Sequence, residues 1–304
     1  MINLHIEKIL EQKLGHHPTG DQLTVMKALA LFVAENSNDS IFLLTGYAGT
    51  GKTSLISALV HTLAGFNINS VLLAPTGRAA KVLASYTRMS AYTIHKHIYR
   101  QKSSSDGLGR FELDRNRQKD TFFIVDESSM ISGESNEASV FGSGRLLDDL
   151  IEFVYQGRNC KLVLVGDTAQ LPPVGSVLSP ALSMQDLSMY GFNIETAELR
   201  EVVRQSRGSG ILMNATSIRK KVAGNDLTVP EFVLESYDDI LRISGETLLE
   251  ELEEAYSFAG IDGTVIIVNS NRMANKYNQG IRNRILYREE EISSGDMLMI
   301  VKNN

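Results

Sequence analysis

The segment Gly46-Tyr47-Ala48-Gly49-Thr50-Gly51-Lys52-Thr53 decides the fold of this chain. It follows an apolar run at residues 41–45, and the apolar spacing of residues 54–63 predicts a helix directly after it. The segment has the pattern G-x-x-x-x-G-K-T, which forms a phosphate-binding loop when a strand precedes it and a helix follows. An incidental glycine-rich turn is the alternative, but the flanking strand and helix favour the phosphate-binding loop.

The residue types of this loop suit a nucleoside triphosphate with Mg²⁺. Its glycines let backbone N–H groups converge on phosphate oxygens at the positive end of the following helix. Lys52 is predicted to reach the β- and γ-phosphates, and the Thr53 hydroxyl is predicted to bind Mg²⁺. The predicted nucleotide-binding residues of the segment are Gly46, Gly49, Thr50, Gly51, Lys52, Thr53 and Ser54. By itself the motif indicates only an NTPase.

Short apolar runs alternate with helical patterns along the first two thirds of the chain. The runs at residues 41–45, 71–74, 122–125 and 162–165 are nearly continuous, as expected for central parallel strands. Helical patterns at residues 54–63, 79–86 and 146–155 separate them. We therefore predict an α/β fold with a parallel sheet, whose ligands bind at the carboxyl ends of the strands.

Two of the later strands end in side chains that suit phosphoryl transfer. Asp126 is predicted to hold Mg²⁺ and the adjacent Glu127 to polarise an attacking water. A solvated acidic strand end is the alternative, which the phosphate loop makes less favourable. After the strand at residues 162–165, Gln170 is predicted either to sense the γ-phosphate or to orient that water.

The composition is that of an ordinary globular protein of 304 residues, with 43% hydrophobic and 22% charged residues. This length predicts one large domain and a second, smaller or partial one. A net charge of −6 disfavours a protein that coats nucleic acid by bulk charge, so any contact needs a local groove. The apolar runs are too short to span a bilayer, and we expect a cytoplasmic protein without membrane contact. The single cysteine, Cys160, is expected to have a packing role.

Three further segments are set apart by their composition. Residues 101–120 are predicted to form an inserted hairpin with an excess of basic side chains, and residues 132–144 a mobile surface loop. A second unit is predicted to begin near residues 206–210. It is expected to contain helices at residues 211–222, 246–256 and 273–286, and a strand at residues 265–268.

The strand ends resemble a known family. Gly166-Asp167-Thr168-Ala169-Gln170-Leu171-Pro172-Pro173-Val174 looks like motif III of superfamily 1 helicases. Asp126-Glu127-Ser128-Ser129-Met130 looks like motif II of the RecD/Dda-like, superfamily 1B group. The resemblance covers most of the chain in the same order. It implies a RecA-like P-loop NTPase domain 1A at residues 1–205, with a small 1B hairpin inserted at about 99–120.

The resemblance also implies where single-stranded DNA would bind. Residues 74–81 resemble motif Ia, and residues 93–96 resemble the T-I-H segment of the family. The candidate DNA-contacting residues are Pro75, Thr76, Arg78, Thr93, His95, Asn271 and Arg272. Considered alone, Arg78 is as readily a solvated residue and His95 as readily a structural hydrogen-bonder.

Two more site residues depend on the resemblance. Residues 199–205 resemble motif IV, whose arginine matches Arg204 and would act on the γ-phosphate as an arginine finger. Residues 19–22 resemble the Q motif, in which Gln22 would hydrogen-bond adenine while Thr19 or Asp21 caps a helix. The implied cofactors are ATP and Mg²⁺, and the implied catalytic residues are Lys52, Glu127, Gln170 and Arg204.

Residues 206–304 resemble a partial second RecA-like domain, 2A, that ends at the entry to an SH3-like 2B insertion, before motifs V and VI. The implied function is ATP hydrolysis by a monomer that translocates 5′ to 3′ on single-stranded DNA or at a forked duplex, in repair or recombination. Without motifs V and VI, this chain is expected to be weakly active or inactive alone.

Two alternatives stay open. One is an ATP-gated module that binds nucleic acid or a partner without translocation. The other is a P-loop kinase, which leaves residues 166–174 unexplained.

Overall fold

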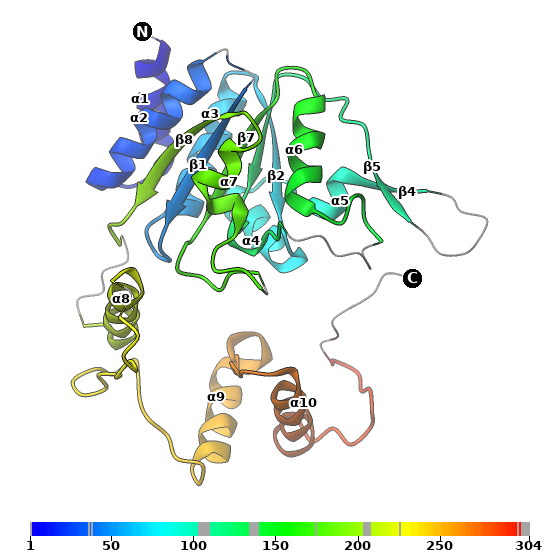
Figure 1. Cartoon of the computed structure of the whole chain (residues 1–304). Helices are drawn as coiled ribbons and strands as arrows, with labels where there is room; N and C mark the ends of the chain where they lie inside the picture. Colours follow the sequence, from blue (N-terminus) through cyan, green and yellow to red (C-terminus); the bar gives the residue numbers. More distant parts are fainter. Residues whose placement is uncertain are drawn as a thin grey trace. The chain divides into compact units, whose positions relative to one another are not determined.

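The computed structural model describes residues 2–35, 37, 39–102, 110–133, 140–173, 175–202, 208–224, 226–296 and 298. The chain divides into a first unit, Met1–Arg207 with Arg219–Leu227, and a second unit, Gly208–Ile218 with Thr228–Asn304 (Figure 1). The predicted nucleotide site falls entirely within the first unit.

Six parallel strands form the sheet of the first unit, in the order β3-β2-β6-β7-β1-β8 (Figure 1). Their bounds are β1 (Ser40–Gly46), β2 (Asn69–Ala74), β3 (Ala91–Thr93), β6 (Thr121–Val125), β7 (Lys161–Gly166) and β8 (Asn193–Leu199). At the centre, Leu43 of β1 pairs with Leu164 of β7 on one side and with Thr196 of β8 on the other. The α/β prediction and the four predicted strands are confirmed, each strand being one or two residues longer than predicted. The edge strands β3 and β8 were missed.

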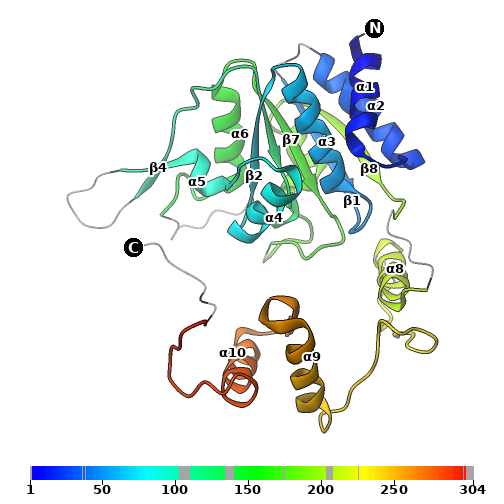
Figure 2. The same cartoon turned by 180° about the vertical axis from the view of Figure 1, so that it is seen from behind.

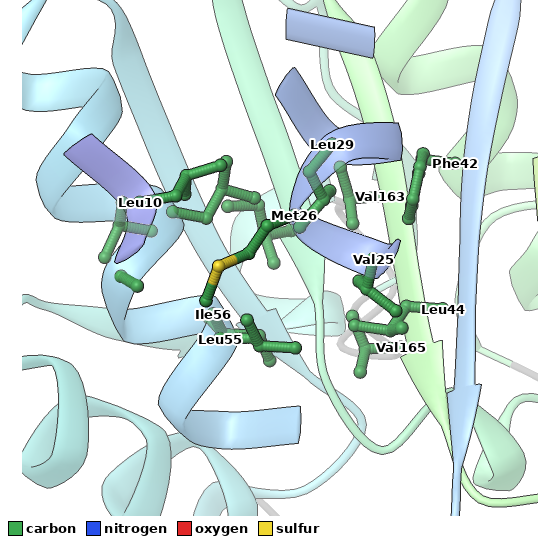
Figure 3. Close-up of a cluster of buried hydrophobic side chains, with 14 of the residues drawn as sticks. Leu10, Val25, Met26, Leu29, Phe42, Leu44, Leu55, Ile56, Val163 and Val165 are labelled. Carbon is green, nitrogen blue, oxygen red and sulfur yellow. The ribbon is translucent and has the colours of Figure 1, made fainter. Parts of the chain in front are cut away.

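Helices cover both faces of this sheet. Their bounds are α1 (Ile2–Leu14), α2 (Gly20–Ala34), α3 (Lys52–Gly65), α4 (Gly77–Thr87), α5 (Ile94–Ile98), α6 (Leu146–Gln156) and α7 (Met184–Ser188), with short 3-10 turns at η1 (Ser128–Met130) and η2 (Pro180–Leu182). Helices α1 to α4 pack on one face of the sheet (Figure 2), and their side chains share one core with alternate strand residues such as Phe42 and Val163 (Figure 3). Side chains of α5 to α7 share the other core with the intervening residues, such as Leu43 and Leu162. Burial on both faces explains the continuous apolar runs in the sequence.

The first of these cores joins the two N-terminal helices to the helix after the phosphate loop. Figure 3 shows Met26 of α2 lying between Leu10 of α1 and Ile56 of α3, and all three side chains are buried. Because α1 packs on both α2 and α3, it joins α2 to the helix whose first residues are Lys52 and Thr53. The N-terminal segment therefore supports the candidate site.

The predicted hairpin insertion is present. Strands β4 (Tyr99–Gln101) and β5 (Phe111–Leu113) pair antiparallel, and residues 103–109 between them lie outside the described residues. Lys102 pairs with Glu112 at 2.5 Å, and Arg100 lies 3.7 Å from Asp114. Part of the predicted basic patch is therefore neutralised within the hairpin.

Residues 140–144 correct part of the prediction of a mobile loop at residues 132–144. The Phe111 N–H donates to the Val140 carbonyl, and the Gly142 N–H donates to the Phe111 carbonyl, both at 2.8 Å. The rings of Phe111 and Phe141 stack with 4.7 Å between centroids. This end of the segment thus pairs with β5 in an ordered structure, while residues 134–139 lie outside the described residues.

The second unit contains α8 (Gly210–Ala223), whose last residues belong to the first unit, α9 (Leu248–Gly263), α10 (Asn271–Gly280) and the π-helix η3 (Ile281–Ile285). The three predicted helices are confirmed. The predicted strand at residues 265–268 is wrong, because this apolar run pairs with no other described strand and leaves Val265 and Ile267 exposed. The predicted entry to an SH3-like insertion is largely outside the described residues. Across the described part of the chain, no helix is long and apolar enough to cross a membrane.

Lys161, the first residue of β7, is buried although it is charged. Its ammonium donates to the backbone carbonyls of Phe32 at 2.5 Å and Glu35 at 2.6 Å, and it lies 4.7 Å from the centroid of the Phe32 ring. These carbonyls are at the end of α2, where no further turn supplies N–H groups. The neighbouring Cys160 is also buried, in agreement with its predicted packing role.

We predict that Lys161→Met lowers the free energy of unfolding by about 1–3 kcal/mol, because it removes the donor for two carbonyls but keeps most of the apolar stem. Urea denaturation measures this difference, with Lys27→Ala on the exposed face of α2 as the control. A Lys161→Met protein as stable as the wild type would show that packing of the stem, not carbonyl capping, is the role of Lys161.

Candidate active site

The phosphate loop joins β1 to α3 with the backbone that the motif requires. Gly49 and Gly51 have φ angles of 81° and 92°, in the left-handed region that favours glycine, and Gly51 is the N-cap of α3. Gly46 has no room for a side chain, since a Cβ there would lie 2.8 Å from the Leu199 Cβ. The Thr50 hydroxyl donates to the Tyr47 carbonyl at 2.7 Å, so this buried residue shapes the loop from within.

Lys52 is the first residue of α3, and its side chain bonds back to the phosphate loop. Its ammonium donates to the carbonyls of Gly46 at 2.7 Å and Tyr47 at 3.0 Å. Burial lowers the pKa of Lys52, while the nearby carboxylates of Asp167, Asp126 and Glu127, in decreasing order, act to raise it. The amine is thus held in a poorly solvated position facing three acids. Phosphate oxygens are suited to replace the two carbonyls as its partners.

Asp126 and Glu127 follow β6 at the same edge of the sheet. Asp126 is only 9% exposed, and burial together with the charge of Glu127 raises the pKa of Asp126 to about 6. One of its oxygens accepts the Glu127 N–H at 2.9 Å. Glu127 has a φ of 56°, a conformation that costs a non-glycine residue energy and is concentrated at functional sites.

These residues fit a bound Mg²⁺. A buried carboxylate that ionises reluctantly is stabilised by a divalent cation, and Mg²⁺ prefers oxygen ligands shared between protein and phosphates. The Asp126 carboxylate and the Thr53 hydroxyl are the side chains that would hold it.

Gln170 follows β7, the strand between the phosphate-loop strand β1 and the acidic strand β6. Its side-chain oxygen accepts a hydrogen bond from the buried Ser129 hydroxyl at 2.8 Å, which leaves the amide N–H groups available to an anion. Asp167 shapes the turn before it, with its side chain accepting the Ala169 N–H at 2.8 Å. The structure therefore places Gln170 with Lys52, Asp126 and Glu127 at the carboxyl ends of the central strands.

Gln22 has a contact that the sequence did not predict. Its amide nitrogen donates to the Thr50 carbonyl at 3.1 Å, and its oxygen accepts the Thr19 N–H at 3.1 Å in a capping box that confirms Thr19 as the cap of α2. The side chain is 0% exposed, so here it braces the phosphate loop rather than presenting an open edge. Its contact with adenine stays a prediction.

Asp21, beside Gln22, holds the segment after β8. One carboxylate oxygen accepts the backbone N–H groups of Arg200 at 2.7 Å and Glu201 at 2.9 Å. A Cβ added to Gly49 would lie 3.3 Å from Val202, so the phosphate loop packs on the same segment. Arg204, the predicted arginine finger, lies outside the described residues.

The candidate DNA contacts of the first unit begin two neighbouring helices. Thr76 caps α4 by accepting the Ala79 N–H, and Thr93 caps α5 by accepting the Lys96 N–H, both at 3.2 Å. Because Ala74 of β2 pairs with Thr93 of β3, these helix starts lie at one edge of the sheet. In the same region Pro75 is half-buried in the turn and Arg78 is exposed on α4.

His95 is packed in an aromatic cluster. Its ring centroid lies 5.0 Å from that of Phe141 and 5.7 Å from that of Tyr99, and burial lowers its pKa. These contacts pack His95 between α5 and the hairpin, and its contact with nucleic acid stays a prediction. Asn271 and Arg272 are exposed at the start of α10 in the second unit.

Sequence reasoning gave no individual role to Asp167 or Ser129, and it missed the contacts that Asp21 makes. Asp167 and Ser129 stand inside motif III and motif II, so their places in those motifs were an available signal. Asp21 was considered only as a helix cap. Its partners, Arg200 and Glu201, lie 179 and 180 positions away, and no local pattern indicates such a pair.

Comparison with known proteins identifies the family of this chain. Residues 19–229 match the family described as AAA domain. The ATP-dependent RecD2 DNA helicase of Deinococcus radiodurans is 30% identical over 178 residues, covering 58% of this chain and 21% of that protein. The ATP-dependent DNA helicase Pif1 of Psychrobacter sp. is 30% identical over 144 residues, covering 44% of this chain and 20% of that protein. The crystal structure of Pif1 helicase from Candida albicans has a TM-score of 0.45 at 19% identity, covering 85% of this chain and 54% of that one.

The chain belongs to the AAA domain family of P-loop proteins. Within it, the chain carries a superfamily 1B helicase P-loop domain of the RecD/Pif1-like kind, as the motifs indicated. The chain spans about a fifth of the length of each of the two helicases matched by sequence.

We predict that Asp126→Asn stabilises the metal-free protein while impairing its site. The folded-state pKa of about 6 lies above the ordinary value of 3.8, so the folded state binds more protons between these values. Stability therefore falls as pH rises from about 4 to about 6, and the full cost is present above pH 6. Asn avoids this cost, so the free energy of unfolding should rise by up to about 3 kcal/mol at pH 7.5.

Denaturation at pH 4 and pH 7.5 in the presence of a chelator measures this effect. The gain should shrink to about 0.5 kcal/mol at pH 4. The exposed Asp262→Asn controls for the loss of one negative charge. A gain that is equal at both pH values would contradict a raised pKa as its cause.

Proposed function

We propose that this chain binds MgATP and hydrolyses it in response to single-stranded DNA, as the motor part of a DNA helicase. The observation that carries the proposal is the grouping of Lys52 with Asp126, Glu127 and Gln170 at the carboxyl ends of three adjacent strands. Each has the chemistry that one part of phosphoryl transfer requires.

In the proposed reaction, Lys52 and the backbone N–H groups of the loop neutralise the β- and γ-phosphates. Glu127 accepts a proton from the attacking water, and Gln170, held by Ser129, donates its amide hydrogens to the γ-phosphate. Mg²⁺, held by Thr53 and Asp126, would supply charge neutralisation between the phosphates when it is bound. The Asp21 carboxylate accepts the backbone N–H groups of Arg200 and Glu201, close to Arg204 in the sequence. These hydrogen bonds support the further proposal that Arg204 completes the site.

We further propose that the strand passes the starts of α4 and α5, at Thr76, Arg78 and Thr93. The adjacent positions of these helix starts support this, since phosphates are commonly bound by helix N-termini and polar side chains. Assignment of residues 206–304 to a second RecA-like domain, with Asn271 and Arg272 on its DNA side, depends on the order of motifs alone. So does translocation from 5′ to 3′.

Steady-state MgATP hydrolysis by the whole chain, with and without an oligodeoxythymidylate, tests the proposal. DNA is expected to stimulate turnover in the wild type, and Lys52→Ala to reduce turnover by at least about 10²-fold by removing a charge that stabilises the transition state. The exposed Lys27→Ala serves as the matched control for loss of a lysine.

Hydrolysis that requires Lys52 but ignores DNA would contradict the coupling and favour an ATP-gated binding module. Failure to bind ATP in the wild type would contradict the proposal as a whole. Phosphate transfer to a small acceptor in place of water would indicate a kinase.

A further inference from the structure

Tyr92 is an exposed aromatic side chain next to the predicted DNA contacts. It is the middle residue of the edge strand β3, pairs with Leu73 of β2 and directly precedes Thr93. Its side chain is 40% exposed, whereas Ala91 and Thr93 on either side are partly buried. The hydrolytic site described above does not use this ring.

The ring of Tyr92 is supported from within the domain. It lies 5.9 Å from the ring of His97, with 31° between the ring planes. His97 in turn contacts Phe123 of β6 and Phe153 of α6 edge-on, at 6.0 and 5.8 Å between centroids. Tyr92 is therefore the exposed end of an aromatic row that begins in the core. A ring held in this way loses little conformational freedom when it binds a ligand.

Positive charge accompanies this ring. The Lys96 ammonium lies 5.7 Å from the centroid of Tyr92, within the range of a cation–π contact. Lys96 is exposed on α5, so it can move from the ring to a nearby anion. On the neighbouring strand, Ala74 pairs with Thr93 and leads into Thr76 and the start of α4. The Tyr92 ring therefore lies beside the exposed Lys96 ammonium, and near the start of α4, which is suited to bind a phosphate.

We propose that Tyr92 is a base-stacking subsite for single-stranded nucleic acid, with Lys96 and the start of α4 contacting the flanking phosphates. Proteins that bind single strands combine a basic groove with aromatic side chains on which bases stack. A protein partner that adds a strand to the sheet beside β3 fits less well, since β3 is only three residues long and offers few backbone groups for pairing. The inference rests on the proposed DNA-binding function and deepens it. Because every base has a π-face, the subsite is expected to have little sequence preference.

Fluorescence anisotropy with a labelled 15-residue oligodeoxythymidylate, using the whole chain, tests this proposal. Tyr92→Ala is expected to weaken binding about 5- to 150-fold at fixed salt, the range for loss of one base–aromatic stack. Tyr92→Phe and Tyr92→Trp keep a ring and should bind within about threefold of the wild type. Tyr86→Ala, at an exposed tyrosine of α4, is the matched control and should bind as the wild type does.

The salt dependence separates stacking from charge. Tyr92→Ala should leave the slope of log Kd against log salt unchanged, whereas Lys96→Ala should reduce the slope by about one. Thermal unfolding of each variant establishes that it is folded. Wild-type affinity in Tyr92→Ala, with binding intact in the wild type, would overturn the stacking subsite alone. Absence of any single-strand binding by the wild type would overturn both this subsite and the proposed function.

Discussion

The structure of the first unit depends on one constraint, the parallel pairing of β1 between β7 and β8 inside a sheet that is buried on both faces. Helices cover the two faces, so the loops at the carboxyl ends of the strands are where polar groups can meet a ligand. The phosphate loop, Asp126 and Gln170 come from three such loops. Their proximity is a consequence of strand order, since β7 lies between the strands that carry the other two groups.

The central strands could be predicted from the sequence because burial on both faces requires unbroken apolar runs. The edge strands could not, since Glu195, Thr196 and Glu198 leave β8 with neither a continuous apolar run nor a period of two, and β3 has only three residues. The apolar run at residues 265–268 shows the converse limit. A β-strand exists only through its partner, and this run has no partner among the described residues of the second unit.

For the site, the motifs identified which residues gather, but not which residues hold them in place. Gln22 was predicted to bond adenine, which stays a prediction, and the sequence did not indicate that its amide nitrogen donates to the Thr50 carbonyl, 28 positions away. His95 was predicted to face nucleic acid, and that contact stays a prediction; its ring packs edge-on against Phe141, a residue far along the chain. Such contacts depend on tertiary packing between distant segments, about which local spacing carries no information.

The tight approach of Gly46 to Leu199 has a mechanical consequence. Gly46 is the last residue of β1, Leu199 is the last residue of β8, and the two strands pair at this point with no space for even a methyl group. The chain thus enters the phosphate loop and leaves the sheet at the same level. A displacement of the phosphate loop at Gly46 would therefore also displace Leu199, the residue at which the chain leaves the sheet.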